Sequence, residues 1–108
     1  MHSFIQVSTT VDNKQDAERL AELAVRKRLA ACVQVIGPIR STYWWEGKIE
    51  DGEEWLCLMK TGKDLYESLE RAIKSIHTYD EPEIIALPIV KGSEGYLRWI
   101  EKETAQDQ

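Results

Sequence analysis

The side chains best suited to chemistry lie in the segment His77-Thr78-Tyr79-Asp80-Glu81-Pro82-Glu83, which follows an apolar pattern at helical spacing. A histidine titrates near neutral pH and binds transition metals, so His77 could carry a proton or supply one metal ligand. With Lys60 or Glu83 it could also form an acid–base pair. The simpler interpretation is a histidine at a helix C-terminus, stabilised by the helix dipole. On these residues alone, both interpretations stay open.

Two other groups of residues carry weaker signals. Lys60 and Thr61 close a predicted central strand, and we expect Thr61 to cap the helix that follows. An acidic set could bind divalent cations weakly, although a charged hairpin edge is the simpler interpretation; its members are Glu50, Asp51, Glu53 and Glu54. The sequence contains no phosphate-binding loop, dinucleotide fingerprint, zinc spacing or nucleophile elbow.

The elements that must position these residues alternate between strands and helices. Short β-branched runs predict strands at 4–10 and 84–90, and a long hairpin spans 31–61. Apolar stripes predict helices at 14–29, capped by Asp12, at 61–76, and from Ser93 to Ile100. The order β-α-β-β-α-β plus a terminal helix predicts an α+β fold. It is a ferredoxin-like split βαβ with two helices on one face of an antiparallel sheet, in a single domain over 1–108.

The hairpin is too long for the body of such a domain. A strand from Val33 to Trp45 spans roughly 40 Å at about 3.3 Å per residue, whereas a 100-residue domain has a radius of gyration of roughly 13 Å. Its tip carries Tyr43, Trp44 and Trp45, which soluble monomers rarely leave in water. We therefore expect these aromatic residues to dock on a second subunit; the alternative is an arm that bends back at Gly37-Pro38 over its own core.

Composition limits the partners and the compartment. The chain has 108 residues, is 43% hydrophobic and carries a net charge of −5, without a basic stripe or an apolar run long enough to cross a bilayer. We expect no nucleic-acid or membrane partner. The N-terminus does not resemble a secretion signal, which favours the cytoplasm. Cys32 and Cys57 are expected to lie about 13 Å apart along the hairpin, too far for a disulfide.

Several motifs occur together in an order and spacing that resemble the divalent-cation tolerance protein family, CutA. They are Leu29-Ala30-Ala31-Cys32-Val33, Tyr43-Trp44-Trp45-Glu46-Gly47-Lys48-Ile49, Lys60-Thr61, His77-x-Tyr79-x-x-Pro82-Glu83-Ile84 and Tyr96-Leu97-x-Trp99. The resemblance covers nearly the whole chain. It implies a tight homotrimer whose hairpins pack across to neighbours, a role in tolerance of copper and other heavy metals, and a trimer similar to that of PII signalling proteins.

The resemblance also implies where a metal would bind. In bacterial members, copper is held by a Cys at the exit of the first strand and by a His-His pair that ends the second helix. These positions are Thr9 and the pair Ile76-His77 here, so only His77 matches. One imidazole does not select a metal, and we expect any copper or other divalent metal to bind weakly. No cofactor is otherwise expected.

Three functions remain, and we favour a trimeric, non-catalytic binding or signalling protein of the divalent-cation tolerance type. Its expected site is a cleft between subunits that takes a metal ion or a small molecule; the residues expected to line it are Thr9, Lys60, His77, Tyr79 and Glu83. The alternatives are a small-molecule enzyme in that cleft and a PII-like effector sensor.

Overall fold

The structure, a computed structural model, describes residues 3–106. Four strands form one antiparallel sheet in the order β2-β3-β1-β4. The elements in chain order are β1 (Phe4–Val11), α1 (Lys14–Arg26), β2 (Cys32–Trp45), β3 (Lys48–Gly62), a short 3-10 helix η1 (Lys63–Leu65), α2 (Tyr66–Ile76), β4 (Ile85–Ile89) and α3 (Glu94–Glu103). This arrangement confirms the predicted α+β, ferredoxin-like fold.

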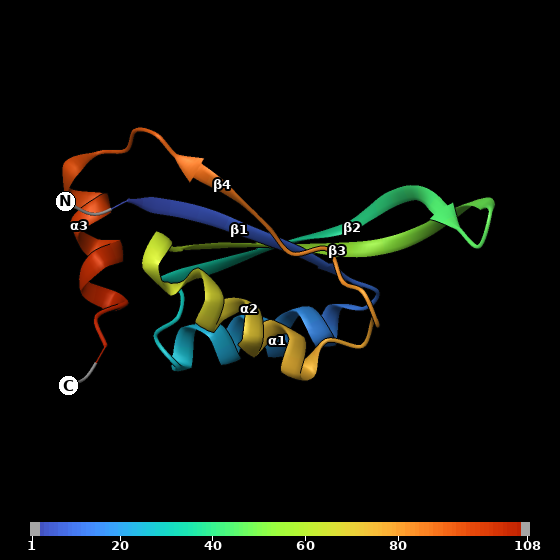
Figure 1. Ribbon diagram of the computed structural model, residues 1–108, viewed down its shortest axis with the longest axis horizontal. Coiled ribbons are helices and arrows are strands. Elements are labelled where there is room, and N and C mark those ends of the chain that lie inside the picture. Colours follow the sequence, from blue (N-terminus) through green and yellow to red (C-terminus); the bar gives the residue numbers. More distant parts are fainter. Residues whose placement is uncertain (1–2, 107–108) are drawn as a thin grey trace.

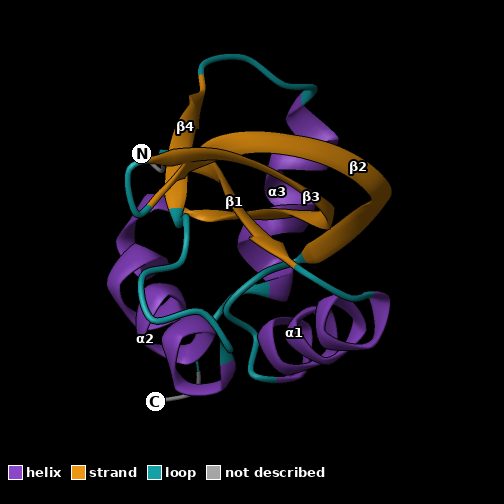
Figure 2. Ribbon diagram, turned by 90° about the vertical axis from the view of Figure 1, so that its right-hand side faces the viewer, coloured by secondary structure: helices purple, strands orange, loops and turns teal. Residues whose placement is uncertain are grey.

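The core lies between the sheet and two helices. α1 and α2 lie side by side on one side of the sheet (Figures 1 and 2). Leu20 of α1 and Ile73 of α2 pack against strand residues that point the same way, such as Val7 and Met59, and all four are almost fully buried. Burying each such side chain contributes about 1.5–3 kcal/mol, so this layer stabilises the fold.

The opposite side of the sheet is apolar and largely uncovered. Alternate strand residues point away from α1 and α2, because successive side chains of a strand face opposite sides. We call five apolar members of this set the open face: Ile36, Leu56, Leu58, Ile85 and Leu87. Ile36, Ile85 and Leu87 are about half exposed. α3 stands at the end of the body far from the hairpin tip, where the Tyr96 hydroxyl lies 3.5 Å from the Cys32 sulfur (Figure 1).

The β2–β3 hairpin extends well beyond the body, as predicted, and gives the molecule dimensions of 45 × 27 × 21 Å (Figure 1). Trp45 pairs with Lys48 across a two-residue turn. Glu46 and Gly47 adopt positive φ angles of 50° and 81°, as tight hairpin turns require. The arm does not bend back over its own core, because the aromatic residues at its tip remain exposed.

A bulge interrupts the pairing of β2 with β3. Gly37 and Pro38 together face Trp55, so Ile36 pairs with Leu56 and Ile39 pairs with Glu54. A Cβ atom on Gly37 would lie 2.2 Å from the Trp55 ring, which explains the glycine at this position. The bulge shifts the register by one residue and places Cys57 opposite Val35. Both cysteines are free thiols.

Two predicted helix caps are wrong. Asn13, not Asp12, caps α1, and its side chain accepts a hydrogen bond of 2.8 Å from the Asp16 amide. Thr61 does not cap α2, because β3 continues to Gly62 through its pairing with β1 and η1 follows before α2 begins at Tyr66. Ser93 caps α3 as predicted. The local sequence around Thr61 fits a helix cap. The pairing of Thr61 with Ile5 of β1 instead keeps it in β3.

Candidate functional site

His77 is fixed by hydrogen bonds at both nitrogens of its ring. It follows the last residue of α2, and its Nε2 lies 2.9 Å from the carbonyl oxygen of Thr10 at the end of β1. A carbonyl only accepts, so Nε2 carries the proton. The Tyr79 amide donates a hydrogen bond of 3.1 Å to Nδ1. Nδ1 therefore accepts through its lone pair. His77 thus joins the end of β1 to the loop after α2.

Tyr79 continues this chain of hydrogen bonds to the hairpin. Its ring lies 4.9 Å from the His77 ring, and its hydroxyl donates to Oε2 of Glu54 at 2.8 Å. Burial, and then the bond to the Glu54 carboxylate, raise the pKa of Tyr79 well above its usual value. Both effects disfavour the phenolate, so Tyr79 is a hydrogen-bond donor at neutral pH. His77, Tyr79 and Glu54 thus form one connected polar site where the hairpin leaves the body.

The other expected site residues do not join this group within one subunit. Thr9 is fully buried on the side of the sheet that faces the helices, directly opposite Cys57, and its hydroxyl has no hydrogen-bond partner among the described residues. Lys60 lies on the other side of the sheet and donates to the Gln34 side chain. Glu83 is exposed in the loop before β4. One subunit therefore brings together only His77 and Tyr79 of the five.

Glu54 is the site residue that sequence reasoning missed. Its sequence context groups it with the acidic hairpin residues, because nothing nearby in the sequence connects it to Tyr79, 25 positions away. The acidic residues themselves do not converge, because the described residues contain no group of three or more His, Cys, Asp or Glu side chains able to hold a metal ion. Instead, Asp51 bonds to Arg40 at 2.8 Å and to Thr42 at 2.6 Å. Both hydrogen bonds lower the pKa of Asp51, and the bond from Thr42 has the larger effect.

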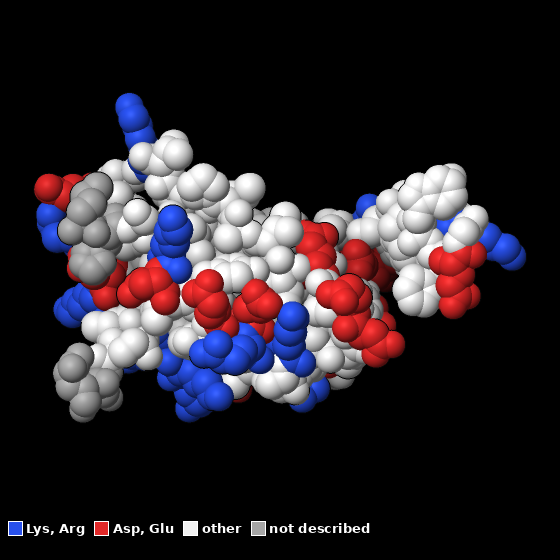
Figure 3. Space-filling view, in the orientation of Figure 1, with Lys and Arg blue, Asp and Glu red and all other residues white. Residues whose placement is uncertain are grey.

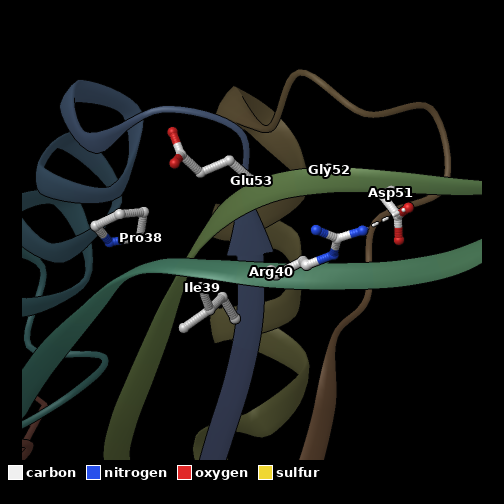
Figure 4. Close-up of a pocket in the computed structure, with 6 residues that line it drawn as sticks. All are labelled: Pro38, Ile39, Arg40, Asp51, Gly52 and Glu53. Atoms are coloured by element: carbon white, nitrogen blue, oxygen red, sulfur yellow. Dashed lines mark hydrogen bonds and ion pairs between the residues drawn. The ribbon is translucent and has the colours of Figure 1, made fainter.

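Two surface hollows lie away from His77. One, of about 450 Å³, sits on the hairpin itself, where Pro38 and Arg40 of β2 face Asp51 and Glu53 of β3 (Figure 4). A larger groove, of about 870 Å³, runs between β4 and the first turn of α2. Acidic side chains also gather where the hairpin leaves the body, on the side seen in Figure 3. Neither hollow contains a residue of the expected cleft.

The fold and this site can be compared with known proteins. Residues 5–103 match the family model described as CutA1 divalent ion tolerance protein. The chain belongs to this family. The assignment confirms the resemblance carried by the hairpin and His77 motifs.

Relatives in plants and archaea are about two-fifths identical to this chain over the aligned residues. The chloroplastic protein CutA 1 of Oryza sativa is 43% identical over 102 residues, which are 94% of this chain and 58% of the relative. The divalent-cation tolerance protein CutA of Archaeoglobus fulgidus is 39% identical over 102 residues, or 94% and 97% of the two chains. The chain thus spans little more than half of the plant relative and nearly all of the archaeal one.

Solved CutA1 structures have the same fold. The crystal structure of CutA1 from Oryza sativa superposes with a TM-score of 0.94 at 42% identity, covering 97% of this chain and 96% of the other. CutA from Archaeoglobus fulgidus, described as periplasmic, gives 0.90 at 38% identity, covering 97% and 100%. The superposition extends over nearly the whole chain and so includes the hairpin.

The metal positions implied by the CutA1 family do not fit a tight copper site in this chain. Thr9 offers one buried hydroxyl, Ile76 has no donor atom, and both nitrogens of His77 are already bonded. Cys57 lies beside Thr9, but burial raises the pKa of its thiol to about 11 and disfavours the thiolate that binds metals.

No described helix is long and apolar enough to cross a bilayer.

Proposed function

We propose that the protein is a non-catalytic binding or signalling subunit of a homotrimer that serves divalent-cation tolerance. The observation that carries this proposal is the hairpin tip, which we define as Tyr43, Trp44, Trp45 and Ile49. Its side chains are 45%, 72%, 61% and 63% exposed. Trp44 and Ile49 share one side of the ribbon, whereas Tyr43 and Trp45 lie on the other, so the tip is apolar on both sides. Large aromatic side chains of this kind anchor protein interfaces.

The open face of the sheet supports the same proposal. Exposed Ile36, Ile85 and Leu87 are separated from the tip along the molecule, so one subunit has two apolar surfaces to cover. A protruding arm and an uncovered sheet are complementary features of a subunit that assembles in a closed ring. The threefold number is what the CutA resemblance implies.

A non-catalytic role is supported by the arrangement of the possible acids and bases. The two bonds of His77 hold its ring in place and occupy its lone pair, and Lys60 lies on the opposite side of the sheet from Thr9. Thermal unfolding of the native protein with metal salts, nucleotides and small metabolites tests this role. A saturable rise in melting temperature with an organic molecule alone would favour an enzyme or a PII-like sensor instead.

Substitution of the hairpin tip tests the assembly. Trp44→Ala combined with Trp45→Ala removes two large anchors, each of which contributes about 1.5–3 kcal/mol at every copy of the interface. We expect light scattering at micromolar concentration to give the 12.5 kDa monomer or aggregates instead of a trimer. Val25→Ala, which removes an exposed apolar side chain from α1, is the control and should leave the mass unchanged. A double variant that remains trimeric would refute the role of the tip.

We place the protein in the cytoplasm. Two free thiols and the absence of a disulfide among the described residues are compatible with a reducing compartment. The periplasmic and chloroplastic descriptions apply to the Archaeoglobus and Oryza relatives. Cell fractionation, with detection of the native protein, tests this placement.

A further inference from the structure

The bond between Tyr79 and Glu54 lies at a particular point of the hairpin. β1 pairs with β3 from Trp55 to Gly62, so Glu54 is the first residue of β3 beyond the pairing with β1. From Glu54 to the turn, β3 pairs with β2 alone. The bulge at Gly37-Pro38 lies across from Trp55, next to this point. Tyr79 therefore contacts the hairpin where it leaves the sheet and bends.

A two-stranded ribbon beyond a bulge needs an outside contact to hold one direction. Bulges bend and twist a ribbon locally, and an isolated two-stranded ribbon is only marginally stable. The contact from Tyr79 has the properties of a firm attachment, because a phenol donates to a carboxylate at 2.8 Å between partly buried side chains. Hydrogen bonds to charged groups are stronger than those between neutral groups.

The loop that presents Tyr79 is itself held to the sheet. The His77 ring donates to the Thr10 carbonyl and accepts from the Tyr79 amide two residues on. Thr10 is the second-last residue of β1, in the centre of the sheet. A continuous set of three hydrogen bonds thus runs from the central strand, through the two aromatic side chains, to the start of the free hairpin.

We propose that Tyr79 is a positioning residue that sets the direction of the hairpin, with His77 fixing the loop from which the phenol reaches Glu54. This gives the His-x-Tyr motif a mechanical role inside one subunit, separate from any ligand. It deepens the proposed function and rests on it in one respect: an arm that docks on a neighbour must leave its own sheet at a defined angle. The bond itself does not depend on assembly.

Hydrogen–deuterium exchange of the amides in residues 39–54 measures this attachment directly. Tyr79→Phe removes only the hydroxyl and keeps the ring against His77, and Glu54→Ala removes the acceptor. We expect each variant to raise exchange in this segment on the order of tenfold, and the double variant to raise it no further, since both remove one bond. Glu54→Gln keeps an acceptor oxygen but loses the charge, so its exchange should lie between that of wild type and that of Glu54→Ala.

Tyr66→Phe is the matched control. Its hydroxyl also donates from a partly buried tyrosine, to the Ile84 carbonyl at 3.4 Å, and this acceptor lies outside the hairpin. This variant should leave exchange in 39–54 unchanged. The set is measured in the native protein and again with Trp44→Ala and Trp45→Ala present, because docking on a neighbour could mask local opening.

The outcomes separate this proposal from the proposed function. Unchanged exchange for Tyr79→Phe in both backgrounds, or additive effects of Tyr79→Phe and Glu54→Ala, would overturn the positioning role. A trimer that survives loss of both tryptophans would refute the docking of the tip and leave the positioning role intact. Faster exchange at 39–54 with Tyr79→Phe alone, but not with Tyr66→Phe, would confirm the attachment.

Discussion

Thr9 has a different setting from the one its place in the sequence suggests. It stands where bacterial relatives are expected to carry a copper-binding cysteine, yet its side chain is buried beneath the helices and faces Cys57 on β3. Side chains directly opposite on antiparallel strands have Cβ atoms about 4.5–5.5 Å apart. A cysteine at position 9 would therefore meet a second thiol, which changes what a restored metal site would contain.

Calorimetric titration with copper tests whether positions 9, 76 and 77 determine the affinity for the metal. We expect the wild-type protein to show no tight, stoichiometric site and only weak binding that is lost in His77→Ala, because Thr9 and Ile76 supply no thiolate or imidazole. Thr9→Cys with Ile76→His should raise the affinity and leave the oligomer unchanged.

A third substitution separates the two possible sources of the gain. Adding Cys57→Ala to Thr9→Cys and Ile76→His removes the facing thiol. Retained affinity would assign the ligands to the restored cysteine and the two histidines, whereas lost affinity would assign them to the buried pair of thiols. A sub-micromolar wild-type site that survives His77→Ala would contradict the expectation and point to another ligand set.

At the scale of elements, the hairpin bulge depends on a glycine with no room for a side chain. The Cβ atom of Gly37→Ala would overlap the Trp55 ring at 2.2 Å, so the ring or the bulge must move. Overpacking of this kind typically costs about 1–3 kcal/mol, and we expect a lower urea midpoint with the same slope. Gly95→Ala is the control, because its Cβ meets nothing within 4 Å near the start of α3. It should be neutral or stabilising by up to about 1 kcal/mol. Equal midpoints for the two variants would show that the Trp55 ring can move aside without loss of stability.

Local patterns in the sequence predicted the elements well and the contacts between them poorly. The hairpin turn followed from Gly47, whose backbone freedom is visible in one residue, and α2 followed from an apolar stripe at helical spacing. The failed cap at Thr61 and the missed partner Glu54 have one cause. Both depend on residues distant in sequence, Ile5 across the sheet and Tyr79 across the loop. The buried setting of Thr9 was also unpredictable, since a strand register fixes which side a residue faces.

At the scale of the whole molecule, the open face should matter as much as the hairpin tip. Leu87 lies on β4 opposite Gln6, points away from α1 and α2 and is 58% exposed. Leu87→Glu would place a charge on a surface that assembly is proposed to cover, and an unpaired buried charge is costly. We expect light scattering to show dissociation at micromolar concentration. Val25→Glu, on the outer side of α1, should keep the wild-type mass. An unchanged mass for Leu87→Glu would exclude this face from the assembly.

The order of strands in the sheet also has a consequence for synthesis of the chain on the ribosome. β1 is made first but lies between β3 and β4, and its pairing with β4 joins Phe4 to Ile89. The hairpin, whose strands are adjacent in sequence, can close much earlier. A nascent chain therefore presents an aromatic arm and a half-paired β1 before β4 is made. In that interval the exposed arm and the unpaired edge of β1 are the surfaces most prone to aggregate with other unfinished chains.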